Sequence, residues 1–312
     1  MLIGVLLILP LFLGSYELHI LIITFYYIIV ACGWNLIAGY SGQFSLAHHT
    51  FAALGGYTSA LLAVNFGIPP LLGIFIGGLT AMTTSYVIGR LCLKLRAIYL
   101  AIATWAFSGC FELFIRMQYE WTRGDLGLPT PPLLVSASKI PYYYIGFSIM
   151  LVSVLIMYKI VNSKVGLYIR AIRDDEEAAM AMAVDTVKWK TFTFSLVGFF
   201  AGIAGAFRAH YIGLMSPVTA RFDEMIIIIL MVILGGYGTF LGPIIGAPLV
   251  RVLLEYLRVY GEIRMILFAA LVIIISRFFR GGLVGLFNLL TKSFGSLRSK
   301  PESKKVVLKQ MD

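Results

Sequence analysis

Long apolar stretches, separated by short polar segments, occupy most of the chain. A helix needs about 20 predominantly apolar residues to cross the hydrocarbon layer of a membrane. The stretches lack the alternating apolar and polar positions that membrane β-barrels show. We therefore predict an all-α integral membrane protein with about ten transmembrane helices, some of them short or broken. The ten stretches are 2–14, 18–38, 44–64, 69–92, 97–117, 142–160, 190–208, 224–240, 242–258 and 263–279.

Two regions depart from a simple span. The stretch 2–14 is short and contains Pro10. A signal peptide is the alternative, but no basic segment precedes this stretch and no A-x-A-like site follows it, so we favour a short membrane helix. Residues 224–258 predict two short, broken helices, because irregular backbone is tolerated at membrane depth only beside protein or a cavity. The residues that interrupt this region are Gly235, Gly236, Gly238, Gly242 and Pro243.

Loop charges predict the orientation of the spans. With a cytoplasmic amino terminus, ten crossings return the carboxyl terminus to the cytoplasm. Seventeen Lys and Arg residues then lie in inside segments and seven in outside segments, as the positive-inside rule requires. This topology predicts a transmembrane domain over 1–291, with a cytoplasmic loop at about 161–189, and a basic flexible cytoplasmic tail over 292–312 beside anionic lipid.

The amino-acid composition excludes several functional classes. The chain is 60% hydrophobic and 13% charged, with a net charge of +10, whereas soluble domains are near 25% charged. The basic excess is accounted for by topology and lipid contact, so we expect no nucleic-acid partner. We find no P-loop, metal-ligand or Ser–His–Asp pattern, and the three cysteines lie in apolar runs. We therefore predict no enzymatic activity, no metal and no cofactor bound by this chain.

Acidic residues within the predicted spans are few. Ion-coupled carriers use acid–base pairs at mid-membrane, and we identify no such pair. Glu112 lies four residues before Arg116, and Glu255 lies on one helical face with Arg251 and Arg258. Residues three or four apart are neighbours on a helix, so we expect local ion pairs at both positions.

The loop 161–189 contains a short segment with helix-forming character. Acids suit the positive end of a helix dipole, and four of them precede the Ala/Met segment 178–184. That segment is too short to cross a membrane and too apolar to lie free in water. Either it packs on the protein's own inner face or the lipid headgroups, or it inserts into a groove on a cytoplasmic protein.

Four motifs resemble those of the branched-chain amino acid permeases of binding-protein-dependent ABC importers, specifically the longer, LivM-type subunit. They lie at Gly39 to Tyr57 (GYSGQFSLAHHTFAALGGY), Thr122 to Gly127 (TRGDLG), Arg170 to Ala179, and Leu234 to Pro243 (LGGYGTFLGP). The resemblance covers about residues 20 to 290. Two positions depart from the family pattern. Ala47 stands where Gly is usual, and Ala183 stands where the cytoplasmic helix commonly ends in Gly. Alanine does not easily form a left-handed helix cap.

The resemblance implies an ABC importer permease fold in the plasma (inner) membrane. It also implies three kinds of partner: a second homologous permease subunit, two cytoplasmic ABC ATPases that hold ATP and Mg, and a periplasmic or lipid-anchored substrate-binding protein. The importer would take up leucine, isoleucine and valine. Same-scaffold permeases for urea, amides or aromatic acids, and an ion-coupled secondary transporter, remain alternatives. The implied ATPase-coupling loop comprises Arg170, Arg173, Asp174, Asp175, Glu176, Glu177, Ala178, Ala179, Ala183 and Val184.

Polar residues inside apolar spans are candidates for the translocation path, because such side chains must face protein or water rather than lipid. Interhelical hydrogen bonding is the alternative use. The candidates are Asn35, Gln43, Ser45, His48, Thr104 and Ser108, with His49 an additional histidine beside the family position. Among the glycines, Gly39 and Gly42 are expected at close helix contacts. Charges for docking a binding protein are expected at Arg123, Asp125, Lys139, Arg208 and Arg221.

Overall fold

The computed structural model describes residues 6–92, 95, 97–134, 138–261 and the single positions 263, 266, 270, 282, 283 and 285. Helices account for nearly all of the regular structure in these ranges. Within them, the only sheet is the short antiparallel pair of β1 (Leu128–Pro129) and β2 (Leu214–Met215), in which Leu128 lies opposite Met215. The prediction of an all-α membrane protein is therefore confirmed.

The helices fall into three groups by length. The long ones are α2 (Ser15–Asn35), which continues into the π-helical turn η2 (Leu36–Tyr40), α3 (His48–Phe66), α4 (Pro70–Cys92), α5 (Ala97–Met117), α7 (Ile140–Val161) and α10 (Thr186–Ile212). The intermediate ones are α8 (Lys164–Asp174), α11 (Phe222–Gly236) and α12 (Leu241–Tyr256). The short ones are η1 (Leu9–Leu11), α6 (Tyr119–Thr122), η3 (Gly124–Leu126), α9 (Glu176–Ala181), η4 (Pro217–Ala220) and η5 (Leu257–Tyr260).

Eight of the ten predicted stretches, from 18–38 to 242–258, each correspond to one of these helices. Among the described residues, five helices are long and apolar enough to cross a membrane: α2 with its π-helical turn, α4, α5, α7 and α10. In the first stretch, the described residues form only a short helical segment that ends in η1 around Pro10. The tenth stretch, 263–279, lies mostly outside the described residues, as does the predicted tail.

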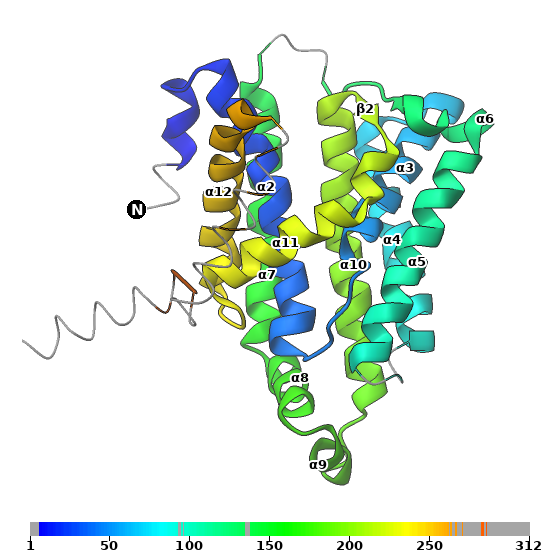
Figure 1. The fold of residues 1–312 in the computed structure, drawn as a ribbon, viewed down its shortest axis with the longest axis vertical. Coiled ribbons are helices and arrows are strands. Elements are labelled where there is room, and N and C mark those ends of the chain that lie inside the picture. Colours follow the sequence, from blue (N-terminus) through cyan, green and yellow to red (C-terminus); the bar gives the residue numbers. More distant parts are fainter. Residues whose placement is uncertain are drawn as a thin grey trace, which may run out of the picture.

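The long helices run roughly parallel between two ends of the molecule (Figure 1). We call the end with α6 and β2 the upper end, and the end with α8 and α9 the lower end. Helix α2 is almost completely enclosed, by α7, α10 and α12, whereas α5 lies at one edge and is mostly exposed. Because α2 has an apolar surface on nearly every side, its sequence suits this central position.

Helices α3, α4 and α10 pack with their backbones in direct contact. A Cβ atom at Gly202 of α10 would lie 2.8 Å from the carbonyl oxygen of Gly77 and 3.1 Å from Cα of Gly78. A Cβ at Gly205 would collide with the backbone of Ala52 on α3. Small residues permit such approaches, and close packing drives helix association in lipid, where apolar burial gives little advantage.

The glycine contacts predict that the stability of the protein falls sharply as the side-chain volume at position 202 increases. Gly202→Val should lower the apparent melting temperature of the detergent-solubilised protein, because overpacking a tight contact costs about 1–3 kcal/mol. Gly109→Val on α5 is the matched control, since no heavy atom lies within 4 Å of a Cβ there. Thermal unfolding followed by size-exclusion chromatography would measure both. Equal melting temperatures for the two variants would contradict the packing described.

Candidate coupling and translocation site

The lower end of α2 is joined to the turn between α11 and α12 by one side chain. Asn35 Nδ2 donates a hydrogen bond to the carbonyl oxygen of Thr239 (2.8 Å), and Asn35 Oδ1 accepts one from the backbone N–H of Gly238 (2.9 Å). Tyr237 adds a third link, because its hydroxyl donates to the carbonyl oxygen of Ala38 (2.6 Å). A Cβ at Gly39 would lie 3.0 Å from Cα of Gly238, so this approach depends on glycine.

The turn itself has the backbone of an interrupted helix. Gly236 and Gly238 have φ values of 134° and 73°, which side chains other than glycine rarely tolerate. The hydroxyl of Thr239 donates to the carbonyl of Gly236 (2.7 Å) and accepts from the N–H of Gly242 (3.1 Å). Helices α11 and α12 contain 15 and 16 residues, about 23 and 24 Å at 1.5 Å per residue. They are the two short, broken helices expected for 224–258.

Helix α8 contacts the π-helical turn through two arginines. Arg173 Nη1 donates to the carbonyl oxygen of Gly39 (2.9 Å), and its guanidinium also holds Asp174 (2.8 Å). The guanidinium of Arg170 lies 5.8 Å from the ring centroid of Tyr40 and donates to the carbonyl of Val161. The two arginines of α8 and the π-helical turn therefore form one contact region.

Helix α9 has a defined cap at each end. Asp175 Oδ1 accepts from the N–H groups of Glu177 and Ala178, both at 3.0 Å. At the other end, the N–H of Ala183 donates to Met180 O (3.0 Å) and that of Val184 to Ala179 O (3.1 Å), which is the Schellman pattern.

Residue 183 does form a left-handed cap. The backbone of Ala183 has φ = 60°, a conformation that alanine does not easily adopt. The conformation costs an L-residue roughly 1–2 kcal/mol. The two cap hydrogen bonds offset that cost. Helix α9 consequently ends at Ala181, before the end of the predicted segment 178–184.

One face of α9 is covered by the protein and the other is not. Ala179 is buried, and an ion pair joins Glu176 to Lys190 of α10. Met180 is 52% exposed and Met182 is 80% exposed. In Figure 1, α9 projects from the lower end of the molecule, beyond the long helices.

The segment between the π-helical turn and α3 is irregular and mostly buried. Helix α3 begins at His48, four residues later than the predicted stretch 44–64. Ser45 O accepts from Trp34 Nε1 (2.8 Å), and the N–H of Leu46 donates to Thr104 Oγ1 (2.9 Å). Backbone groups of such a segment need partners inside the protein at membrane depth, and these bonds supply them. Ala47, the N-cap of α3, has φ = −102°, which does not require glycine.

Four of the six candidate path residues bridge elements. Asn35 holds the α11–α12 turn, and Ser45 and Thr104 pair with Trp34 and Leu46. Ser108 Oγ lies 2.6 Å from Thr50 Oγ1 and 2.9 Å from His49 Nε2, and the same His49 nitrogen lies 3.0 Å from Ala220 O. Through Thr104 and Ser108, the exposed helix α5 is fixed to the start of α3.

Gln43 and His48 each have a buried polar atom with no hydrogen-bond partner in the part of the chain that the structure describes. These atoms are Gln43 Oε1 and His48 Nε2. Gln43 borders a cavity of about 230 Å³ at the lower end, which Ser41, Arg173, Asp174, Glu176 and Lys190 also line. This cavity therefore lies directly between the π-helical turn and the acidic start of α9.

The local ion pairs expected from spacing are present. Glu112 and Arg116 are 3.0 Å apart, and Arg116 also pairs with Asp125 (3.1 Å). Glu255 lies 3.3 Å from Arg251 and 3.2 Å from Arg258.

Arg208 is not at the surface position expected for it. Its guanidinium lies 4.8 Å from the ring centroid of Tyr26, with Nη2 3.5 Å from Glu224 Oε1. The side chain is only 16% exposed, so Arg208 is not the free surface charge expected for docking. Gly213, with φ = 78°, caps α10, so the helix continues past the predicted end at residue 208. A glycine C-cap is visible in sequence.

The other expected docking charges lie at the upper end. Asp125 is engaged by Arg116, Lys139 Nζ donates to Ser15 O (2.9 Å), and Arg221 pairs with Asp223 (2.7 Å). Arg123 is exposed and has φ = 59° at the end of α6. Within the described part of the chain, no three His, Cys, Asp or Glu side chains come together as a metal site requires.

The Asn35 contacts predict a specific loss of stability. Asn35→Leu should lower the melting temperature, because each buried backbone group left without a partner costs about 1–3 kcal/mol. Thr24→Val is a matched control in the same helix, since Thr24 donates only to Ile20 O of α2. Thermal unfolding in detergent measures the difference. Identical curves for both variants would show that Asn35 does not hold the α11–α12 turn.

Comparison with known proteins places these features in a family. The LivM branched-chain amino acid permease of Escherichia coli is 27% identical over 85% of this chain and 69% of its own length. The autoinducer 2 permease LsrC of Yersinia pseudotuberculosis is 29% identical over 60% of this chain and 54% of its own. The fructose permease FrcC of Rhizobium meliloti is 23% identical over 63% and 58%. No solved structure matches significantly. Residues 17–276 match the permease component of branched-chain amino acid transport systems, and the chain belongs to that family.

Proposed function

We propose that this chain is the permease subunit of an ABC importer for leucine, isoleucine and valine. The chain itself is no enzyme, and separate ATPase subunits bind ATP and Mg and hydrolyse the nucleotide. The observation that carries this proposal is α9, a capped helix with two uncovered methionines, in contact with the π-helical turn through α8. Methionine side chains adapt well to apolar grooves, and short helices of this kind bind in grooves.

The coupling path follows the contacts from α9 to the middle of the molecule. Movement of α9 on an ATPase shifts α8, and Arg173 transmits that shift to Gly39 O in the π-helical turn. Asn35 then transmits it to Gly238 and Thr239 between α11 and α12. Each step is a direct polar contact between two elements, so the displacement need not spread through loosely packed side chains.

The proposed orientation puts the lower end in the cytoplasm of a cell with this importer in its plasma (inner) membrane. Lys159, Lys164, Arg170, Arg173 and Lys188 all belong to the elements at that end, in accord with the positive-inside rule. The upper end then faces the periplasmic or lipid-anchored binding protein. A second homologous permease subunit completes the pore. It contacts this chain along α5, whose side chains are largely exposed.

Gln43 and His48 are the path residues that this arrangement favours. Both are buried with a free polar atom, and a passing solute can offer the missing partner. Asn35, Ser45, Thr104 and Ser108 then shape the path by fixing the elements around it.

Other substrates are represented among the relatives. LsrC and FrcC are named for autoinducer 2 and fructose, and permeases for urea, amides or aromatic acids share the scaffold. Branched-chain amino acids are favoured because the family match and the LivM relatives, which cover 85% of the chain, carry that name. An ion-coupled carrier is disfavoured because it would have no use for α9.

Uptake by the reconstituted complex tests the substrate. The chain, its partner permease, the two ATPases and the binding protein in proteoliposomes should accumulate labelled leucine only with ATP. Labelled urea and benzoate, assayed side by side, should not accumulate. Uptake of urea or benzoate without leucine would replace the proposed substrate, and leucine uptake driven by an ion gradient without ATP would reject the ABC mechanism.

The exposed methionines predict where the ATPase binds. Met182→Arg should weaken capture of the ATPase by the purified permease at least tenfold, because a charge in an apolar groove costs more than the 1.4 kcal/mol that a tenfold change represents. Met182→Leu keeps an apolar side chain of similar volume and should bind normally. Membrane insertion should be unaffected in both, as 80% exposure of Met182 indicates. Normal ATPase binding by Met182→Arg would show that this face of α9 is not the docking face.

A further inference from the structure

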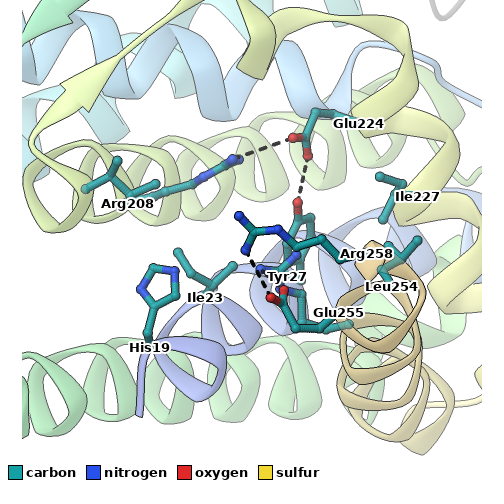
Figure 2. A pocket seen from close by; sticks show the side chains of 11 residues that line it. His19, Ile23, Tyr27, Arg208, Glu224, Ile227, Leu254, Glu255 and Arg258 are labelled. Carbon is teal, nitrogen blue, oxygen red and sulfur yellow. Dashed lines mark hydrogen bonds and ion pairs between the residues drawn. The ribbon is translucent and has the colours of Figure 1, made fainter. Parts of the chain in front are cut away.

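A cavity of about 370 Å³ lies in the upper half of the molecule, among α2, α10, α11 and α12 (Figure 2). It extends along α2 from Tyr27 to His19, about 12 Å at 1.5 Å per residue. Small-molecule sites commonly have volumes of about 300–1,000 Å³. No residue of the cavity belongs to the coupling region or to the candidate path residues at the lower end.

One wall of the cavity is ionic. Arg208 and Glu224 pair at 3.5 Å, and the Tyr27 hydroxyl donates to Glu224 Oε2 (2.9 Å). Further up, Glu255 lies between Arg251 and Arg258 and accepts from Tyr16 OH (2.6 Å). Figure 2 shows Arg208 and Glu224 directed toward each other across the upper side of the cavity.

Several hydrogen-bond donors of the ionic wall have no acceptor among the described residues. Nε and Nη1 of Arg208 and Nε of Arg251 are buried and have no partner among the described residues. The wall carries three guanidinium groups against two carboxylates, and buried donors without acceptors are costly. A ligand that brings a carboxylate would accept from these guanidinium groups and balance the excess positive charge.

The rest of the lining is partly aliphatic. Ile23, Ile212, Ile227 and Leu254 contribute to it, and none of these side chains has a polar group. A ligand that fills the cavity therefore needs both charged groups and an apolar part.

We propose that this cavity binds an aliphatic α-amino acid in transit. The α-carboxylate pairs with Arg208 and Arg251, the α-ammonium with Glu224 or Glu255, and the side chain lies against the isoleucines. The inference rests on the proposed function, which it deepens by locating a substrate site within this subunit. A phosphatidylethanolamine headgroup shares the anion and ammonium chemistry, and the labelling experiment below distinguishes it from an amino acid.

Protection of an introduced cysteine tests the site directly. In the permease–ATPase complex with Cys32, Cys92 and Cys110 replaced by alanine, Ile227→Cys is labelled with a small methanethiosulfonate reagent. Leucine should slow this labelling. The amine 3-methylbutylamine, which lacks the carboxylate, and 4-methylpentanoate, which lacks the ammonium, should each require at least tenfold higher concentration. Val218→Cys in η4, outside the cavity, should be labelled at the same rate with or without leucine.

Substitution of Arg208 in the ionic wall gives a second test of the site. Arg208→Gln should raise the leucine concentration for half-protection at least tenfold, and Arg208→Lys should raise it less. Arg221→Gln is the matched control, because Arg221 pairs with Asp223 in an exposed position outside the cavity. The two ligand analogues decide the question on the Ile227→Cys background even where an Arg208 variant fails to fold.

The outcomes separate this proposal from the proposed function. Leucine uptake without leucine protection of Ile227→Cys would overturn the site and leave the substrate standing. Protection of Ile227→Cys by leucine without leucine uptake would support the binding site but reject leucine as the transported substrate. Protection by both analogues at the same concentration as leucine would overturn the ionic assignment. Slower labelling in phosphatidylethanolamine nanodiscs than in phosphatidylglycerol nanodiscs, with no further effect of leucine, would identify a lipid site instead.

Discussion

The two hydrogen bonds of Asn35 are the constraint on which the lower half of the structure depends. A helix cannot be interrupted at membrane depth unless its freed backbone groups find partners inside the protein. One amide side chain, on the fully enclosed helix α2, satisfies the N–H of Gly238 and the carbonyl of Thr239 together. Aspartate or leucine at this position would satisfy at most one of them. The break between α11 and α12, and the close approach of Gly39 that accompanies it, therefore follow from the identity of a residue about 200 positions earlier in the sequence.

The π-helical turn gives this contact a second role. A turn of this kind is uncommon and is found mostly at functional sites, and here it directs the carbonyl of Gly39 toward Arg173. Gly39 is the second-last residue of the helical segment, which ends at Tyr40, and the last carbonyls of a helix have no partner within the helix. The free carbonyl of Gly39 is thus the acceptor that connects α8 to the membrane helices. The stability of this region and the proposed transmission of movement rely on the same few atoms, so substitutions there are expected to affect both.

The apolar stretches predicted the helices well because a span is a long signal averaged over many residues. The roles of single residues were harder to predict from the sequence. Arg208, the last residue of the predicted stretch 190–208, was expected to be a docking charge, yet its partners, Tyr26 and Glu224, come from two other helices and cannot be inferred from local sequence. Ala183 adopts a left-handed cap that its own propensity opposes, since the caps of a whole helix outweigh one residue's preference. The late start of α3 at His48 depends on contacts with Trp34 and Thr104, and these too are distant in the chain.

The arrangement of charge within the membrane-spanning part gives a physical reason why a chain with few ionisable residues keeps these ones. Removing charges from water is costly, and even paired buried ions seldom stabilise a protein more than apolar residues would. Arg208 and Glu224 pair at 3.5 Å, too far apart for a short charge-assisted hydrogen bond. Three arginine nitrogens of the ionic wall have no partner among the described residues. Tyr26 and Tyr27 surround the guanidinium with aromatic faces, which hold a cation without consuming its hydrogen-bond donors. A purely structural ion pair would be expected to close to optimal geometry. The Arg208–Glu224 pair is open and faces a cavity with aliphatic lining residues. Its unpaired donors remain available to bind a ligand, although leaving them unpaired lowers the stability of the protein. We attribute this loss of stability to function.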